Sequence, residues 1–186
     1  MQKIIIVQAL KEEQVTLPQI DGYEFTQIYT GCGKVSATIA LMQAINAAGT
    51  VAGVVNVGTA GTSHHKVGDV VVCTKFVDRD LKPLNIYGIT SYIETRHEEP
   101  LLQKIAAATS VMETCSTGDS FVTEVLTEGD VCDMEAFAQA QVCKQFDVPF
   151  MSVKYITDVV GQNSVGLWEE RLSGARKGLT EFFKKI

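Results

Sequence analysis

Residues 51–58 read VAGVVNVG, a nearly continuous run of apolar side chains. A strand that helices cover on both faces needs such a run, whereas a strand with one face in water alternates apolar and polar residues. The glycine-rich segment GTAGT, residues 58–62, follows at the end of the run. In parallel α/β sheets, ligands bind beyond the carboxyl ends of the strands. This stretch therefore predicts a buried strand of an α/β protein with a ligand site at its end.

Short runs rich in Val and Ile alternate with amphipathic runs on both sides of this segment. This alternation predicts an α/β fold with a largely parallel or mixed sheet and helices on both of its faces. The longest polar stretch, residues 90–100, is expected to be a surface loop. Expected strands are 3–7, 24–29, 51–58, 68–77, 111–118 and 149–157, and expected helices are 34–49, 101–109, one that begins near residue 133, and about 168–185.

Length and composition suit one domain, which we expect to span residues 1–186. Hydrophobic residues make up 46% of the 186-residue chain, enough for a sizeable core, and no repeat or linker divides it. The formal net charge of −6 argues against a nucleic-acid binder, because phosphate backbones demand clustered Lys and Arg. No apolar run reaches the length of a membrane span, and the N-terminal run is too short for a signal peptide, so no membrane association is expected.

The cysteines and histidines predict no metal site. His64 and His65 are adjacent in the polar segment GTSHHKVGD and are expected in a solvated turn. An odd number of cysteines without metal-binding spacing indicates reduced, buried thiols in a cytoplasmic protein. The five, none of them spaced as Cys-x-x-Cys, are Cys32, Cys73, Cys115, Cys132 and Cys143.

Residues 131–142, VCDMEAFAQAQV, carry two acids, Asp133 and Glu135, ahead of apolar residues at helical spacing. The exposed N–H groups and macrodipole of a first helical turn stabilise acids, so capping explains Asp133 well. Capping explains Glu135 less well, because a carboxylate between Met134 and Phe137 should be paired or bound to a ligand. The stretch alone leaves cap and ligand open. Topology predicts that acids from distant segments converge at one mouth: Glu12, Glu13, Asp119, Asp133, Glu135 and Asp158.

Six motifs together carry a family resemblance. They are NVGTAG (56–61), VGDVVV (67–72), STGDSF (116–121), DMEAFAQAQVC (133–143), VPF (148–150) and KYITDVV (154–160). Their order and spacing resemble the nucleoside phosphorylase and nucleosidase superfamily, and within it the 5′-methylthioadenosine/S-adenosylhomocysteine nucleosidases. The resemblance implies a three-layer α/β/α sandwich with a mixed central sheet that works as a homodimer. It also implies hydrolysis of the N-glycosidic bond between adenine and a 5′-thioribose, with no cofactor or metal.

Breaking this bond develops positive charge on the ribose and negative charge on the purine, so acid, base and sugar-binding groups are needed. By resemblance, Asp158 protonates purine N7 and Glu13, in ALKEEQ, activates the water. Glu135 binds the ribose hydroxyls, which leaves Asp133 as the cap. Glu12 is the alternative base if the alignment shifts by one residue, and a turn cap or a surface acid are the alternatives for Asp158 and Glu13.

The resemblance also implies residues that bind the substrate without reacting. Met134 packs against the sugar, Phe121 stacks on adenine, and Val122 contacts the edge of the base through its backbone. Thr59 helps to position the water, and the glycines around it let backbone N–H groups approach a ligand.

Three further positions complete the implied pocket. Ala9 and Cys32 line it, and Lys154 stands where many bacterial members carry Arg. Lys154 either orients Glu13 or the water, or lies as a solvated strand residue. The segment 78–98 is compact, which leaves specificity for the 5′ group open.

Three other functions compete with this interpretation. A nucleoside phosphorylase needs a basic cradle for phosphate, but the N-terminal loop offers Glu12 and Glu13, which repel phosphate and suit hydrolysis. Futalosine or another adenosine derivative with a bulky 5′ group is an alternative substrate. A non-catalytic nucleoside-binding protein is the third, although a binder has little physical reason to keep these acids.

Overall fold

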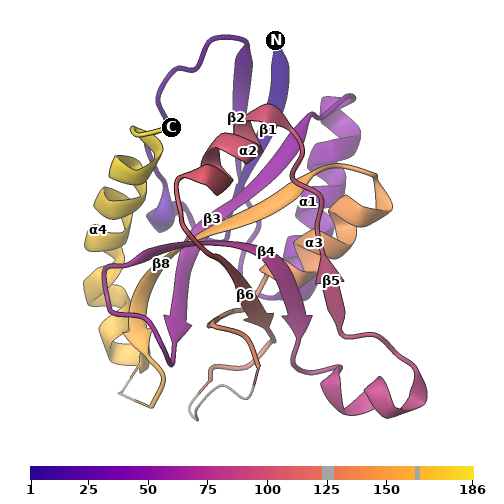
Figure 1. Cartoon of the computed structure of the whole chain (residues 1–186), viewed down its shortest axis with the longest axis vertical. Helices are drawn as coiled ribbons and strands as arrows, with labels where there is room; N and C mark the ends of the chain where they lie inside the picture. Colours follow the sequence, from indigo (N-terminus) through magenta and orange to yellow (C-terminus); the bar gives the residue numbers. More distant parts are fainter. Residues whose placement is uncertain (123–127, 162–163) are drawn as a thin grey trace.

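The computed structural model describes residues 1–122, 128–161 and 164–186 (Figure 1). Strands and helices alternate along these residues, as the apolar runs predict. The strands are β1 (Gln2–Gln8), β2 (Tyr23–Tyr29), β3 (Gly53–Thr62), β4 (Val70–Asp78), β5 (Tyr92–Glu94), β6 (Met112–Thr117), β7 (Val131–Asp133) and β8 (Phe150–Val159). The helices are α1 (Lys34–Ala48), α2 (Pro100–Ala107), α3 (Ala136–Gln145) and α4 (Ser164–Phe183), with short 3-10 helices η1 (Lys11–Glu13) and η2 (Lys82–Tyr87).

The strands form one mixed sheet whose pairings run in a closed circuit. β1 lies between β2 and β3 and is parallel to both. β3 is parallel to β8, and β8 is antiparallel to β4, which also carries β5 at its edge. β4 is parallel to β6, β6 is parallel to β7, and β7 pairs antiparallel with the last two residues of β3. The carboxyl end of β3 thereby pairs with β8 on one side and with the short strand β7 on the other.

Helices cover both faces of this sheet. Side chains alternate along β1, so that Ile5 lies in a buried cluster with Leu41 of α1 and Phe137 of α3. Ile4 lies in a second cluster with residues of α2 and α4 on the opposite face. In Figure 1, α4 stands on the left of the sheet and α1 and α3 on the right. The three-layer α/β/α sandwich with a mixed sheet is thereby confirmed.

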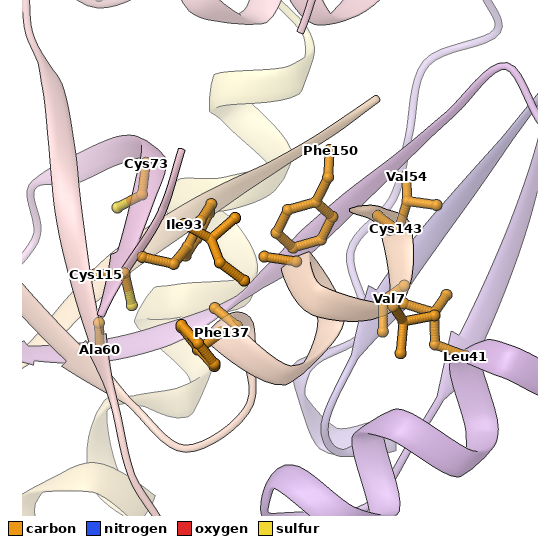
Figure 2. Packing of buried hydrophobic residues seen from close by; sticks show 14 of the residues in the cluster. Val7, Leu41, Val54, Ala60, Cys73, Ile93, Cys115, Phe137, Cys143 and Phe150 are labelled. Atoms are coloured by element: carbon orange, nitrogen blue, oxygen red, sulfur yellow. The ribbon is translucent and has the colours of Figure 1, made fainter. Parts of the chain in front are cut away.

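The first cluster shows how strands and helices share one core (Figure 2). Phe150 of β8, Val54 of β3 and Cys143 of α3 belong to this one buried cluster. The Phe150 ring also packs on Phe76 of β4, with ring centroids 5.2 Å apart. Each buried aliphatic or aromatic side chain of this kind contributes roughly 1.5–3 kcal/mol to folding relative to exposure. The cluster therefore anchors the strands whose ends carry the candidate site.

The segment 131–142 is not helical over its whole length. Val131–Asp133 is strand β7, and α3 begins at Ala136. Val131 is fully buried and pairs with both β3 and β6, so sheet pairing overrides the helical spacing at this point. The helix expected from near residue 133 thus begins three residues later, and α4 begins at Ser164 rather than near residue 168.

Residues 90–100 are not the plain surface loop that their polarity predicts. Ile93 of β5 is 4% exposed and packs into the first cluster. Glu99 is buried, and its carboxylate accepts hydrogen bonds from the backbone N–H groups of Leu101 (2.8 Å) and Leu102 (3.0 Å) at the start of α2. Tyr23 donates a third hydrogen bond to Glu99 at 2.7 Å. The partners of these polar groups come from distant segments, which a local pattern does not reveal.

The burial of the cysteines and histidines largely agrees with the prediction from the sequence. All five cysteines are free and four are buried, but Cys32 is exposed, so the prediction of a buried thiol was wrong there. His64 is exposed, and the His65 ring is half-buried with Nε2 3.4 Å from Glu113 Oε1. Within the part of the chain that the structure describes, no helix is long and apolar enough to cross a membrane.

Candidate active site

A cavity of about 230 Å³ lies at the carboxyl ends of the strands, where topology predicts a ligand. Residues after β1, β2, β4 and β6 line it, together with residues of β3, β7 and β8. All ten residues that the sequence analysis predicts for the site line this cavity: Ala9, Glu13, Cys32, Thr59, Phe121, Val122, Met134, Glu135, Lys154 and Asp158.

Four of the six acids expected at one mouth line this cavity: Glu13, Asp133, Glu135 and Asp158. Glu12 and Asp119 were predicted there wrongly, since neither lines it. The Glu12 side chain is exposed on η1, and the Asp119 carboxylate accepts the backbone N–H of Lys34 at 2.8 Å, at the start of α1. Their location follows from local backbone direction, which topology alone does not specify.

Glu13 is held inside the cavity by three N–H and O–H donors. It ends the single turn η1 and is 4% exposed. Its Oε1 accepts the backbone N–H of Thr59 at 3.1 Å and the Thr59 hydroxyl at 3.0 Å, and its Oε2 accepts the N–H of Leu10 at 3.2 Å. A Cβ at Gly58 would lie 3.3 Å from Glu13 Oε1. The first glycine of GTAG thus makes room for a carboxylate, a purpose that its sequence context does not indicate.

Asp158 stands at a bulge in β8. The register with β3 runs from Ala60 opposite Ile156 to Gly61 opposite Asp158, so one extra residue is accommodated on β8. Bulges re-aim side chains and are frequent next to active sites. Thr157 donates its hydroxyl to Asp158 Oδ1 at 2.9 Å, and a Cβ at Gly61 would lie only 2.9 Å from Oδ2. The second glycine of GTAG therefore accommodates the other carboxylate of the cavity.

Glu135 lies between β7 and α3, with its carboxylate at the N-terminal end of α1. Its Oε1 accepts the backbone N–H of Gly33 at 2.8 Å. Burial and the charge of Asp133 raise the pKa of Glu135 to about 7, although the Lys154 ammonium and the Gly33 N–H act in the opposite direction. A carboxyl group with this pKa changes its charge near neutral pH.

Lys154 is 2% exposed, so the reading of a solvated strand residue was wrong. Its ammonium lies 2.8 Å from Asp133 Oδ2, and that pair is buried on both sides. Burial would raise the pKa of Asp133, but the Lys154 charge and hydrogen bonds from Thr117 (2.6 Å) and Ala136 (2.9 Å) hold it below its usual range. Burial would also lower the pKa of Lys154, yet Asp133 holds it above its usual range.

This pair revises the capping interpretation of Asp133. Asp133 accepts the backbone N–H of Ala136, the first residue of α3, but the N-cap position itself is held by Glu135, so Asp133 caps the helix only from two residues before it. The buried ion pair with Lys154 is the stronger constraint on the carboxylate, and two residues 21 positions apart gave no local sign of it.

Two of the predicted lining residues, Phe121 and Cys32, are exposed. Phe121 is 45% exposed and Val122 is half-buried, both in the connection after β6. Partial burial raises the pKa of the Cys32 thiol, and so do the charges of Glu135 and Glu13. Cys32 therefore lies within electrostatic reach of both acids.

The cavity suits chemistry by carboxyl groups. Among the described residues, no group of three or more His, Cys, Asp or Glu side chains is arranged to hold a metal ion. Of the described lining residues, the cations are Arg79 and Lys154. Lys154 is paired with Asp133, and the Arg79 guanidinium donates to backbone carbonyls. Glu13, Glu135 and Asp158 thus face the cavity with different partners and different surroundings.

A family model described as the phosphorylase superfamily matches residues 6–185, nearly the whole chain. The chain belongs to this superfamily. A curated relative, the 5′-methylthioadenosine/S-adenosylhomocysteine nucleosidase of Bacillus subtilis (strain 168), is 29% identical over 196 residues, covering 93% of this chain and 84% of the relative.

Solved structures of the superfamily share the fold. The 5′-methylthioadenosine/S-adenosylhomocysteine nucleosidase of Helicobacter pylori, with butyl-thio-DADMe-Immucillin-A, superposes with a TM-score of 0.80 at 25% identity, over 100% of this chain and 99% of that one. The futalosine hydrolase of Helicobacter pylori strain 26695 superposes with a TM-score of 0.77 at 23% identity, over 100% and 98%. At that identity the second likeness concerns the fold alone.

Several lining residues of this superfamily member were missed by sequence reasoning: Asn56, Arg79, Ser120, Cys132 and Thr157. Arg79, Ser120 and Thr157 lie at or just after strand ends, so the rule that sites form there would have found them, whereas Asn56 lies in the first half of β3 and gave no such signal. Cys132 lies in β7, where burial raises the pKa of its thiol to about 12 and leaves it an inert wall residue.

Proposed function

We propose that this chain hydrolyses the N-glycosidic bond of 5′-methylthioadenosine, S-adenosylhomocysteine or both, and releases adenine and the 5-thioribose product. The observation that carries the proposal is the presence of Glu13, Glu135 and Asp158 in one cavity of about 230 Å³. The similarity to the 5′-methylthioadenosine/S-adenosylhomocysteine nucleosidase of Bacillus subtilis supports the substrate class.

In the proposed reaction three carboxyl groups divide the work. Asp158 gives its proton to purine N7 as the bond between N9 and C1′ breaks, and the bonding electrons leave with the base. Glu135 accepts hydrogen bonds from the two ribose hydroxyls, which strengthen as charge develops on the sugar. Glu13 takes a proton from a water whose oxygen attacks C1′. The products are adenine and the free sugar, so atoms and charge balance without another reactant.

The other lining residues are proposed to orient the substrate. Phe121 stacks on adenine, Val122 binds its edge through the backbone, and Met134 packs against the sugar. Thr59 holds Glu13 through two hydrogen bonds to the same oxygen, which orients the base toward its water. Ala9 and Cys32 complete the wall.

Lys154 is proposed to act indirectly, through Asp133, without contacting the substrate. Its ammonium lies 2.8 Å from Asp133 Oδ2, beside the segment that leads to Glu135. This contact supports a role in holding the ribose-binding acid rather than in binding the water.

The charges around Glu13 favour water over phosphate as the nucleophile. A phosphate beside a buried carboxylate is repelled, and a phosphorylase compensates by supplying cations. The described cations of the cavity, Arg79 and Lys154, already have partners in backbone carbonyls and Asp133. We therefore propose a hydrolase rather than a phosphorylase.

For assembly and location, we propose that the chain is a single domain and forms a homodimer in the cytoplasm. Val35, Ile39 and Met42 of α1 are 70%, 54% and 39% exposed. Their spacing of four and three residues lines them up on one side of the helix, and an apolar stripe of this kind favours a second protein surface. Sedimentation equilibrium of the wild type and of Ile39→Lys tests the dimer, since a monomeric wild type would refute it.

The decisive experiment measures adenine release from 5′-methylthioadenosine with and without inorganic phosphate, and identifies the sugar. Release of free 5-methylthioribose independent of phosphate supports the proposal, whereas a sugar 1-phosphate would show a phosphorylase. Parallel assays of S-adenosylhomocysteine and futalosine show which 5′ substituent the enzyme prefers.

A matched pair of variants tests the base. Glu13→Gln should lose turnover while still binding adenine, and Glu12→Gln, on the same turn but exposed, should keep it. The reverse result would mean that the neighbouring acid is the base.

A further inference from the structure

Arg79 makes an unusual set of contacts at the wall of the cavity. It follows β4 directly and is half-buried. Its Nη1 donates to the carbonyls of Ser116 (2.8 Å) and Asp133 (3.0 Å), and its Nη2 donates to those of Gly118 (2.9 Å) and Ser120. Each terminal nitrogen thus serves two backbone oxygens, and the planar fork of a guanidinium can place donors in this way where a lysine ammonium cannot.

The four carbonyls belong to two different walls of the cavity. Residues 116–120 run from the end of β6 into the connection that carries Phe121 and Val122. Asp133 ends β7 and leads directly into Met134 and Glu135. Arg79 is therefore a bridge between the segment proposed to bind the base and the segment proposed to bind the ribose.

Gly118 gives the guanidinium its space. A Cβ at Gly118 would lie 2.6 Å from Arg79 Nε and 2.7 Å from Cζ, far inside van der Waals contact. The guanidinium is fixed by its four carbonyl partners, so it has little freedom to retreat. The glycine of STGDSF is thus explained by steric fit to Arg79.

We propose that Arg79 is a positioning residue that holds the base-binding and ribose-binding walls of the cavity together and so sets the affinity for the nucleoside. The inference rests on the proposed function for its substrate. The acid and the base of that function lie elsewhere, Asp158 on β8 and Glu13 on η1, and the Arg79 guanidinium donates to neither segment. Loss of Arg79 should therefore raise KM much more than it lowers kcat.

The test compares Arg79→Ala and Arg79→Lys with Arg96→Ala, a control in which an exposed arginine is removed. Several charge-assisted hydrogen bonds are lost in Arg79→Ala, so KM for the nucleoside should rise at least about 10-fold while kcat changes less than about 3-fold. Lysine keeps the charge but not the fork and should fall between alanine and the wild type. An unchanged KM in Arg79→Ala, or a fall in kcat alone, would overturn the proposal.

A double-variant cycle separates positioning from simple loss of structure. Gly118→Ala alone should reproduce the rise in KM, because its new methyl group displaces the guanidinium. In the Arg79→Ala background the same methyl group meets no obstacle, so the second substitution should add less than about 2-fold. Fully additive effects would mean that Gly118 does not act through Arg79.

Amide hydrogen exchange in the absence of ligand keeps this inference distinguishable from the proposed function. Residues 116–122 should exchange faster in Arg79→Ala than in the wild type or Arg96→Ala. If the wild type released no adenine, the proposed function would be refuted. The comparison of exchange rates would still show whether Arg79 bridges the two walls. Equal exchange in all three proteins would refute the bridging role.

Discussion

Replacing Glu135 with glutamine should make the protein more stable above pH 7, although it removes a residue of the proposed site. The pKa of Glu135 is raised from 4.5 to about 7, mainly by burial. The native state therefore holds this proton more tightly than the unfolded chain does between those two values. As the pH rises through that window, the free energy of unfolding falls, and the loss is complete above about pH 7.

The size of the effect follows from the same two pKa values. Their difference corresponds to about 3 kcal/mol at 25 °C, which the ionised carboxylate costs the folded protein at pH 8. Glutamine carries no charge, and its amide oxygen still accepts the Gly33 N–H. Glu135→Gln should thus be stabilised by up to about 3 kcal/mol at pH 8, or roughly 6–12 °C in Tm for a chain of this size. Below about pH 4.5 the two proteins should be nearly equal.

Chemical denaturation at a series of pH values checks this prediction, with Glu24→Gln as the control. Glu24 is exposed on β2, so its replacement should change stability by less than about 0.5 kcal/mol at any pH. The reasoning would be refuted if Glu135→Gln were destabilised at pH 8 or if its advantage did not depend on pH. In the same series, KM of the wild type should fall as the pH rises past about 7, because the ionised form accepts the ribose hydroxyls.

Three other substitutions follow from the geometry. Gly61→Ala places a methyl group 2.9 Å from Asp158 Oδ2 and 3.1 Å from Cys132 Sγ, so kcat should fall at least about 10-fold and overpacking should cost roughly 1–3 kcal/mol of stability, as steady-state kinetics and thermal scans would show. Asp158→Asn should abolish adenine release while calorimetry still detects adenine binding, and near-full activity would exclude Asp158 as the proton donor. Lys154→Met leaves Asp133 buried without its cation and should cost about 3–5 kcal/mol in urea unfolding, part of which a second change, Asp133→Asn, should restore.

The strands and their burial could be predicted from the sequence because they depend on local composition. Residues 53–58 of the predicted run form the first part of β3 and all six are buried, but the strand continues through the GTAGT segment, which was expected to follow it, to Thr62. The helices were predicted well where an apolar stripe faces the sheet, as in α2, whose Leu101, Leu102 and Ile105 are buried. Apart from the start of α4, the errors include β5 and β7, where three residues each are too few to impose a pattern and pairing with neighbouring strands decides the structure.

The candidate site could be predicted in its membership but not in its contacts. A motif carries residue types in order, so the ten nominated residues could be named before their positions were known. The choice between Glu12 and Glu13 depends on which way one turn of η1 faces, and Thr59, 46 residues away, supplies the bonds that hold Glu13. Nothing near either acid in the sequence encodes that contact.

The sequence by itself determined the alternation of strands and helices, the two apolar faces of the sheet and four of the six acids expected at its carboxyl ends. These follow from hydrophobic periodicity and residue order, which act within a few residues along the chain. Only the tertiary structure decided the Lys154–Asp133 pair, the bulge that aims Asp158 and the bridge at Arg79. Each of these features forms only where segments distant in the sequence come into contact. Burying a charge or a carbonyl at such a contact costs free energy unless it is paired or hydrogen-bonded.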